Sequence, residues 1–444
     1  MVDAGRGPQR SGVESEPHAV YKIRGGQPLS GTVTPQGNKN AALPMLAATL
    51  LTSEPVRLAN IPDIRDVRSM IGLLDHAGAE AASDGKGSWT LQTREIRETR
   101  ADIRLARSIR ASFLLAGPLL ARAGRAELPR PGGDRIGRRP LDTHIHAFQG
   151  LGADVEILAD RYVLTAPKGL SGSDLFLPEA SVMATENTVM AASLARGETT
   201  IRNAASEPHV QEVCRLINDM GGRIEGIGTN VLHVAGGNEL HGARAEVGPD
   251  HIEVGSFIGL AVATGGEMLI RGVRPVQNLR MTRIAMARLG IAWEDRGDDI
   301  FVPAGQELVI RDDLHGAVPK IDDGPWPAFP PDLTSIALVL ATQARGTILI
   351  HEKMFESRLF WVDRLISMGA RIILCDPHRA IVVGPSKLYG QSLSSPDIRA
   401  GMALVIAALC AEGVSTIQNV HQIERGYEAL SERLRALGAD IERV

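Results

Sequence analysis

Apolar and polar positions follow one another along this chain in a unit that occurs six times. Each unit has apolar residues at helical spacing, then a glycine, then the start of a short apolar strand, as in LLDHAGAEAA and LISMGARIIL. Because glycine adopts the left-handed conformation at little cost, it suits the position just after a helix. The pattern therefore predicts six helices that end at Gly78, Gly152, Gly221, Gly290, Gly369 and Gly438.

A second kind of helix is predicted within the units, after a hairpin such as GADVEILADRYVLTA. It consists of small and apolar residues, as in ENTVMAASLARG, TSIALVLATQARG and GMALVIAALCAEG. Helices with so little polar surface are buried on most sides. Each unit is therefore predicted to be a small sheet that covers buried helices, and the whole chain to be an α/β protein.

Six such units predict two globular domains of three units each, because the period is too long for the usual solenoids. A strand-like segment, AVYKIRGGQPLSGTVTPQ, precedes the first full unit, so both chain ends are expected in the same domain. We predict a disordered leader at 1–18, one domain from 19–38 plus 250–444, and another from 39–249. The alternative is that the six glycines are unrelated helix caps, which their near-constant spacing disfavours.

The composition is that of an ordinary globular protein, with 444 residues, 44% hydrophobic and 23% charged. The net charge of −4 gives no general reason to expect nucleic acid or an anionic membrane as a partner. The three cysteines form no CxxC pair, which disfavours a disulfide framework and fits a reducing compartment. No apolar run reaches the roughly 20 residues that span a bilayer, and the polar start is no signal peptide. A cytoplasmic protein is expected.

A candidate anion site lies in PQGNKNAALPML, where a glycine and Asn-Lys-Asn precede an apolar helix. The amides at a helix N-terminus and the side chain of Lys39 can converge on one phosphate or carboxylate. The spacing is not that of a Walker A loop. The alternative is that Lys39 is a solvated residue at a helix cap.

Arginines occupy similar places in other units. Arg110 in SIRASFLL and Arg399 in PDIRAGMAL each come just before a predicted buried helix, and Arg358 and Arg425 lie in FESRLFW and QIERGYEAL. The guanidinium group pairs well with carboxylates and phosphates because it is planar and bidentate. Each arginine alone is more often part of a surface salt bridge. Their recurrence beside apolar helices favours a shared anionic ligand.

Two acids stand out as candidates for general acid–base catalysis. Asp134 lies in LPRPGGDRIGRRPLDTHI, between glycines and prolines and among four arginines. Asp332 lies in GPWPAFPPDLTSI, a proline-rich turn before an apolar helix, where the alternative is a helix N-cap. His144 and His146 have no cysteine or acidic partner at metal-binding spacing, so no metal site is expected.

The chain resembles the enolpyruvyl transferases, and among them the branch that acts on nucleotide sugars, from about Val20 to Val444. The resemblance rests on GNKNAALP, IRASFLLAGPLLAR, PGGDRIGRRPLDTHI, NAASEPHV, GPDHIEVGSF, PAFPPD, MFESRLFWV, PDIRAG and IERGYEALSERLRALGADIERV. It implies an inside-out α/β barrel of two domains with buried helices, which agrees with the six predicted units. It also implies transfer of the enolpyruvyl group of phosphoenolpyruvate to the 3-hydroxyl of UDP-N-acetylglucosamine, with release of phosphate, at the start of peptidoglycan synthesis.

The resemblance implies roles for individual residues. Lys39 and Asn40 match the pair that binds phosphoenolpyruvate, and Lys39 is also implied in catalysis. Arg139, Arg399 and Arg425 match arginines that hold the phosphate and carboxylate of that substrate. Contacts to the nucleotide sugar are implied for Arg110, Arg139, Pro140, Leu141, Asp142, Thr143, Ser181, Val182, Asp332 and Met354. No cofactor or metal is implied, and both substrates are small molecules.

Asp134 occupies the position at which most family members carry a cysteine, the proton donor to the methylene carbon of phosphoenolpyruvate. A carboxylic acid can supply the same proton, and the flanking glycines would let the loop close over the substrate. Asp332 matches the acid beside the reacting hydroxyl. Members with the cysteine are inactivated by fosfomycin, an epoxide that alkylates the thiol. Because a carboxylate is a weaker nucleophile, an active but fosfomycin-insensitive enzyme is expected.

Two alternatives stay open at this point. The acceptor could instead be a free nucleotide or shikimate 3-phosphate, since Met183 and Glu179 depart from common family residues near the expected nucleotide contacts. The chain could also be a binding protein that kept the fold without the activity, because one fold hosts many functions. The joint presence of Lys39, Asp134 and Asp332 with the arginines favours an enzyme.

Overall fold

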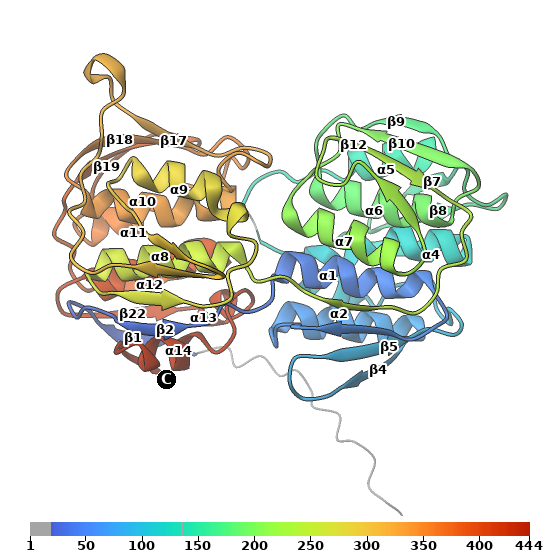
Figure 1. Cartoon of the computed structure of the whole chain (residues 1–444), viewed down its shortest axis with the longest axis horizontal. Helices are drawn as coiled ribbons and strands as arrows, with labels where there is room; N and C mark the ends of the chain where they lie inside the picture. Colours follow the sequence, from blue (N-terminus) through green and yellow to red (C-terminus); the bar gives the residue numbers. More distant parts are fainter. Residues whose placement is uncertain (1–18, 135) are drawn as a thin grey trace, which may run out of the picture.

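Figure 1 shows the chain as two globular halves that lie side by side. This computed structural model describes residues 19–134 and 136–444, so the predicted leader at 1–18 and Arg135 lie outside the described residues. Among the described residues, five sheets have four strands and one has three. The six sheets agree with the predicted repeat, in which each αβ unit contributes one small sheet.

Three sheets belong to each half, and within each sheet neighbouring strands are hydrogen-bonded in the order named. In the half that contains residues 39–249 they are β13 (Arg244–Glu246), β3 (Val56–Ala59), β5 (Trp89–Gln92) and β4 (Glu80–Ser83); β6 (Arg125–Pro129), β8 (Arg161–Thr165) and β7 (Asp154–Ile157); and β11 (Arg223–Glu225), β12 (Val231–Ala235), β10 (Glu198–Arg202) and β9 (Asp174–Phe176). In the other half they are β15 (Glu294–Arg296), β16 (Asp299–Val302), β14 (Met268–Ile270) and β2 (Gly31–Val33); β17 (Lys320–Asp322), β18 (Gly346–His351), β20 (Arg379–Gly384) and β19 (Arg371–Asp376); and β21 (Ser392–Ser394), β22 (Val414–Gln418), β1 (Tyr21–Arg24) and β23 (Asp440–Arg443).

The helices of small and apolar residues lie inside each half. In one half α8 (His251–Thr264), α10 (Thr334–Gln343) and α12 (Ile398–Cys410) pack against one another. In the other, α4 (Ala116–Ala123) packs on α6 (Val182–Leu194), and α1 (Lys39–Ala48) contacts the 3-10 turn Arg110–Leu115 that leads into α4. All residues of α12 from Ile398 to Leu409 are buried, as expected of a helix that is apolar all round.

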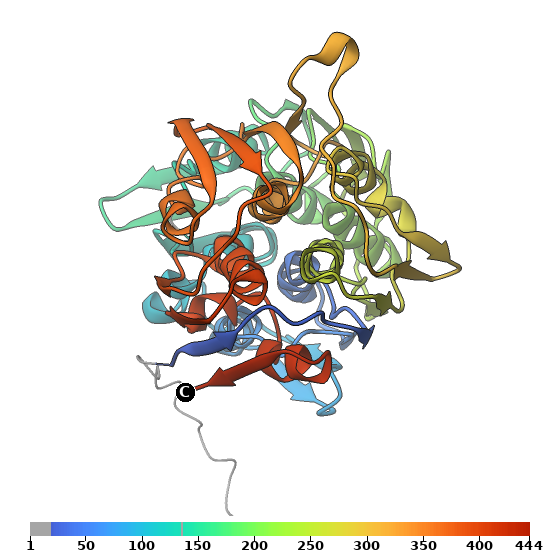
Figure 2. The ribbon, with the colours of Figure 1, turned by 90° about the vertical axis from the view of Figure 1, so that its left-hand side faces the viewer.

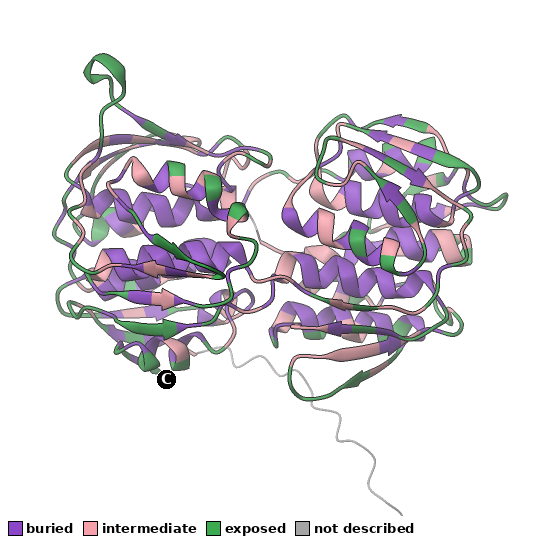
Figure 3. Ribbon diagram, viewed as in Figure 1, coloured by how far each residue is buried: buried purple, intermediate pink, exposed green. Residues whose placement is uncertain are grey.

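The views from two sides show the same arrangement. In Figure 2 the strands of one half lie around its central helices. Figure 3 shows these helices as largely buried, while exposed residues gather on the outer strands and loops. The predicted inside-out α/β fold is confirmed.

The six repeat glycines follow a second, outer set of helices. These helices are α2 (Arg65–Ala77), α5 (Asp142–Gly150), α7 (Pro208–Asp219), α9 (Arg280–Ala287), α11 (Val362–Ser367) and α14 (Leu430–Ala436). All six glycines have a positive φ, from 82° at Gly290 to 112° at Gly78, which confirms that the pattern marked helix ends. The remaining α-helices of the described residues are the short α3 (Ile103–Ser108) and α13 (Val420–Ile423).

The first and last described strands share a sheet, since β1 pairs antiparallel with β23 and Tyr21 lies opposite Arg443. From there the chain crosses to the other half through residues 34–38 and returns through 247–250. Two hydrophobic cores result, one within residues 21–33 and 252–441 and the other within 41–247. The predicted domain boundaries fall between these cores, and the boundaries themselves stay a prediction.

The two crossing segments are hydrogen-bonded to each other. The backbone N–H of Asn38 donates to Gly248 O at 2.8 Å, and that of Asp250 donates to Gln36 O at 2.8 Å. A Cβ at Gly37 would lie 1.8 Å from the backbone oxygen of Asn60, so this crossing requires glycine. The paired segments fix the place at which the halves meet, next to the start of α1.

Candidate active site

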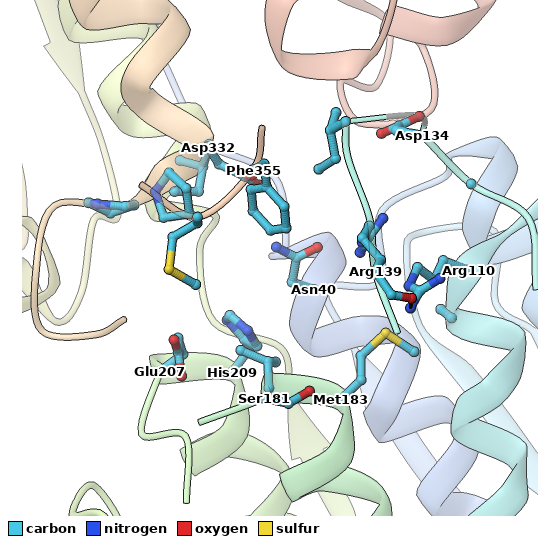
Figure 4. Close-up of a pocket in the computed structure, with 18 of the residues that line it drawn as sticks. Asn40, Arg110, Asp134, Arg139, Ser181, Met183, Glu207, His209, Asp332 and Phe355 are labelled. Carbon is cyan, nitrogen blue, oxygen red and sulfur yellow. Dashed lines mark hydrogen bonds between the residues drawn. The ribbon is translucent and has the colours of Figure 1, made fainter. Parts of the chain in front are cut away.

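One pocket lies where the two halves face each other, and both contribute to its wall. From the half with residues 39–249 come Lys39, Asn40, Arg110, Asp134, Arg139, Pro140, Ser181 and Val182, and from the other half Asp332, Met354, Arg358, Arg399 and Arg425. Figure 4 shows several of these side chains around the pocket. Residues singled out in separate sequence motifs are thus brought together in one place.

Lys39 and Asn40 are the first two residues of α1. The side-chain oxygen of Asn38 caps this helix by accepting a hydrogen bond from the backbone N–H of Asn40 at 2.8 Å. The positive end of the helix dipole therefore lies at the pocket, where it favours an anion. The Lys39 side chain is only 11% exposed, which fits an anion site better than a solvated cap.

Arg425 is held by two carboxylates from the opposite half. Its Nε and Nη2 donate to Asp66 at 2.8 and 3.3 Å, and its Nη1 donates to Asp134 Oδ1 at 2.6 Å. The Nζ atom of Lys39 lies 3.4 Å from Asp66 Oδ2. Asp66, which the sequence reasoning missed, thereby holds two of the predicted substrate-binding cations next to each other.

The loop that carries Asp134 is closed onto the opposite half. The backbone N–H of Arg138 donates to Glu356 Oε1 at 2.7 Å, and that of Ser357 donates to Ile136 O at 3.0 Å. A Cβ at Gly137, whose φ is 141°, would lie 2.5 Å from Glu356 Oε2. The glycine therefore allows the loop to approach closely enough for Asp134 to reach Arg425.

Asp332 lies in the 3-10 turn Pro331–Leu333, just before α10. Its two oxygens accept hydrogen bonds from Arg358 Nη2 and Arg399 Nε, each at 3.0 Å. Burial alone would raise the pKa of Asp332, but Arg399 and Arg358 hold it well below its usual range. α10 has no side-chain cap, so the alternative that Asp332 is its N-cap is wrong.

The two arginines on Asp332 keep donors that the protein does not use. Arg358 and Arg399 are 3% and 4% exposed, and the Nη1 atom of each is buried without a hydrogen-bond partner among the described residues. Buried donors are rarely left unpaired, because an unmade hydrogen bond costs free energy. An anionic ligand between the halves would satisfy both of them.

Two further cations stand together on the expected nucleotide side. Arg110 donates through Nη2 to the backbone oxygen of Arg139. Burial, and then the charge of Arg110, lowers the pKa of Arg139 to about 10. Met183 and Glu179, the two departures from the family pattern, line the pocket here as well, together with Met354 from the opposite half.

Three of the predicted nucleotide contacts do not line this pocket. Leu141 and Thr143 are buried, and Asp142 is exposed at the first residue of α5. Their predicted role stays a prediction, because residues beside the pocket can act through their backbone. His144 is buried and lines the pocket: Asn187 Nδ2 lies 3.1 Å from its Nδ1, and burial lowers its pKa to about 3.

The sequence reasoning missed several other residues that line the pocket. They are Asp66, Glu186, Glu207, His209, His251, Trp326, Phe355 and Asp397. Several of them stand in motifs that carry the family resemblance, as Glu207 and His209 do in NAASEPHV, but the sequence reasoning gave these residues no role. They meet only because distant units pack together. Among them, Asp397 caps α12 through hydrogen bonds from the N–H groups of Arg399 and Ala400 at 2.8 and 2.9 Å.

Comparisons with known proteins show the family to which the chain belongs. A family model described as EPSP synthase (3-phosphoshikimate 1-carboxyvinyltransferase) matches residues 23–434. The chain belongs to this family of enolpyruvyl transferases. A relative from Treponema denticola is 55% identical over 422 residues, which cover 95% of this chain and 98% of the relative. Another from Bradyrhizobium diazoefficiens is 55% identical over 425 residues, covering 96% and 98%. Both are named UDP-N-acetylglucosamine 1-carboxyvinyltransferase.

Solved structures of other family members have the same fold. The enolpyruvyl transferase NikO from Streptomyces tendae superimposes with a TM-score of 0.86 at 25% identity, covering 96% of this chain and 99% of NikO. EPSP synthase from Acinetobacter baumannii gives a TM-score of 0.75 at 17% identity, covering 96% and 100%. Within the described residues of this family member, no helix has the length and apolar character needed to cross a bilayer.

Proposed function

We propose that this enolpyruvyl transferase moves the enolpyruvyl group of phosphoenolpyruvate to the 3-hydroxyl of UDP-N-acetylglucosamine and releases phosphate, the first committed step of peptidoglycan synthesis. The relatives that are 55% identical over nearly the whole chain are named UDP-N-acetylglucosamine 1-carboxyvinyltransferase. The observation that carries the proposal is the pocket between the halves, in which two acids stand among cations with unused donors.

Phosphoenolpyruvate binds at the cations that gather around Asp66, Asp134 and Asp332. Lys39, Arg139, Arg399 and Arg425 supply positive charge for its phosphate and carboxylate, and Asn40 stands beside Lys39 at the start of α1. Planar guanidinium groups hold such oxygens in a fixed geometry. The diphosphate of the second substrate binds at Arg110 and Arg139, with Ser181 and Val182 at the N-terminus of α6 nearby.

The reaction needs one base and one acid at these positions. Asp332 is ionised and accepts the proton of the 3-hydroxyl while the hydroxyl oxygen forms a bond to C2 of phosphoenolpyruvate. Asp134 gives a proton to C3, the methylene carbon. In the second step the bond from C2 to the phosphate oxygen breaks, Asp134 takes a proton back from C3, and the double bond is restored on the sugar ether. The leaving phosphate takes up the proton held by Asp332, so both acids return to their starting states.

Substrate binding prepares the acid for this role. In the described structure Asp134 Oδ1 accepts a hydrogen bond from Arg425 Nη1 at 2.6 Å. When the anionic substrate takes Arg425, the carboxyl group of Asp134 is released from this contact and can turn to the methylene carbon. Closure of the loop also excludes water, which strengthens these electrostatic interactions.

Release of inorganic phosphate from phosphoenolpyruvate tests this function. The purified chain is given UDP-N-acetylglucosamine, shikimate 3-phosphate or UMP as the acceptor, and phosphate and acceptor mass are followed together. We expect one phosphate for each molecule of UDP-N-acetylglucosamine converted, and none above background with the other two. Phosphate release with shikimate 3-phosphate or UMP alone would assign a different acceptor, and no release with any of them would refute the activity.

A further inference from the structure

One wall of the pocket has polar atoms that no described protein group satisfies. Glu186 on α6 and His209 on α7 are 1% and 7% exposed, and Glu207 comes just before α7. Within the described residues, Glu186 Oε1, Glu207 Oε2 and His209 Nδ1 are buried atoms without a hydrogen-bond partner. All three residues line the pocket. Because buried polar groups are nearly always paired, these three atoms indicate a place for a ligand.

This wall lies near the predicted reaction centre but apart from the cations. In Figure 4 Glu207 and His209 lie on one side of the pocket, and Asp332 and Phe355 lie on the other. Both pairs of residues line the same pocket. The backbone N–H of Trp326 donates to Glu207 Oε1 at 3.4 Å and closes this end of the pocket from the opposite half.

The chemistry of the wall fits an uncharged polar group. Burial, followed by the charge of Glu207, raises the pKa of Glu186, and burial also raises that of Glu207. Burial, followed by His251, lowers the pKa of His209 to about 3, so its ring is neutral at physiological pH. Neutral imidazole donates and accepts hydrogen bonds and the oxygens of a carboxyl group accept them, so hydroxyl groups, which do both, can pair with either.

We infer that Glu186, Glu207 and His209 form a subsite for the uncharged hydroxyl groups of the acceptor's sugar ring, next to the 3-hydroxyl held at Asp332. The inference rests on the proposed function and adds the residues that select the sugar. The acceptor then contacts two walls of the pocket: its diphosphate binds at Arg110 and Arg139, and its pyranose ring binds at this subsite. This subsite then distinguishes sugars by the configuration of their hydroxyl groups, because a sugar with a misplaced hydroxyl leaves buried polar atoms of the subsite unpaired.

The test compares sugar recognition with nucleotide recognition. His209→Leu and Glu207→Leu remove the polar atoms, His209→Gln keeps a polar group, and His233→Leu on the exposed face of β12 is the matched control. Dissociation constants are measured without phosphoenolpyruvate for UDP-N-acetylglucosamine and for UDP. In addition, kcat/KM is measured for UDP-N-acetylglucosamine and for its 4-epimer, UDP-N-acetylgalactosamine.

We expect the two leucine variants at the subsite to bind UDP-N-acetylglucosamine roughly 10- to 100-fold more weakly, as for the loss of a buried hydrogen bond, and to bind UDP as the wild type does. Their preference for the natural epimer should fall, while His209→Gln recovers part of it and His233→Leu leaves it unchanged. Equal weakening of UDP and of the nucleotide sugar, or an epimer preference kept in both variants, would overturn the subsite. A wild-type chain that binds the nucleotide sugar more tightly than UDP but releases no phosphate would refute the proposed reaction and keep the subsite.

Discussion

Replacing Asp134 with cysteine should strengthen the binding of phosphoenolpyruvate and create sensitivity to fosfomycin. In the described structure Asp134 occupies Nη1 of Arg425 at 2.6 Å, with the two side chains 18% and 11% exposed. Phosphoenolpyruvate must break this ion pair before Arg425 can hold it. Cysteine removes the competing carboxylate and can still deliver a proton, so Asp134→Cys tests both roles of the residue.

The size of the effect follows from the contact that is lost. A hydrogen bond to a charged group contributes about 1.5–3 kcal/mol to stability. The much smaller contribution of an exposed ion pair does not apply here, because both side chains are mostly buried. Since about 1.4 kcal/mol corresponds to a factor of ten, the KM for phosphoenolpyruvate should fall roughly tenfold or more in Asp134→Cys. Arg425 keeps its two hydrogen bonds to Asp66, so its position is preserved.

The assay is steady-state kinetics at saturating UDP-N-acetylglucosamine, with time-dependent inactivation by fosfomycin and mass spectrometry of the protein. Asp134→Cys should be active and form a covalent adduct, whereas the wild type should be active and form none. Asp134→Ala is the matched control: it also frees Arg425 but carries no acid, so it should bind phosphoenolpyruvate tightly and turn over slowly. An unchanged or raised KM in the cysteine variant, or a fosfomycin adduct on the wild-type chain, would refute the reasoning.

Three other predictions concern the acids of the pocket. Asp332→Asn should lower kcat roughly 10²- to 10⁴-fold, because the variant has lost the proposed base, and it should keep the affinity for the nucleotide sugar. Steady-state kinetics and calorimetry measure the two quantities, and a kcat near that of the wild type would remove Asp332 from catalysis. Asp66→Asn should lower the free energy of unfolding by about 3 kcal/mol in urea, because Arg425 and Lys39 lose a buried shared carboxylate; an unchanged unfolding midpoint would show that Asp66 does not hold them. Since the arginines hold the pKa of Asp332 below its ordinary value of 3.8, the stabilisation is present above pH about 4 and is lost as pH falls through the folded value. Wild type should therefore lose more stability than Asp332→Asn on acidification, and equal losses would contradict the ion pairs.

The fold could be predicted from the sequence because its signals are local. The apolar faces of the helices and the glycines that end them lie within one unit, so each unit can be recognised by itself, as at Gly78 and Gly290 with their positive φ values of 112° and 82°. The buried helices can be recognised from composition alone, because a segment such as that of α12 leaves no polar face for solvent. The strand-like segment before the first full unit predicts that both chain ends lie in one domain, and the pairing of β1 with β23 agrees with this.

The site was predictable only where its residues stand in recognisable motifs. Lys39, Asp332 and the arginines stand in such motifs, but Asp66 does not, since Arg425 is 359 positions away and nothing near Asp66 marks it as a partner. The same holds for Glu186, which looks in sequence like an ordinary helix residue. His209 stands in NAASEPHV, a motif that carries the resemblance but assigns this residue no role. What makes them functional candidates is burial without a partner among the described residues, and that property belongs to the packed structure.

The mass of the product formed in D₂O tests the central claim most directly. If Asp134 protonates C3 of phosphoenolpyruvate from exchangeable hydrogen, the purified chain should convert UDP-N-acetylglucosamine into a species heavier by one enolpyruvyl group, with deuterium in its methylene group. Asp134→Ala should form little of this product, because the loop then carries no acid. An acceptor whose mass is unchanged, or a wild-type product whose methylene group contains no deuterium, would contradict the account.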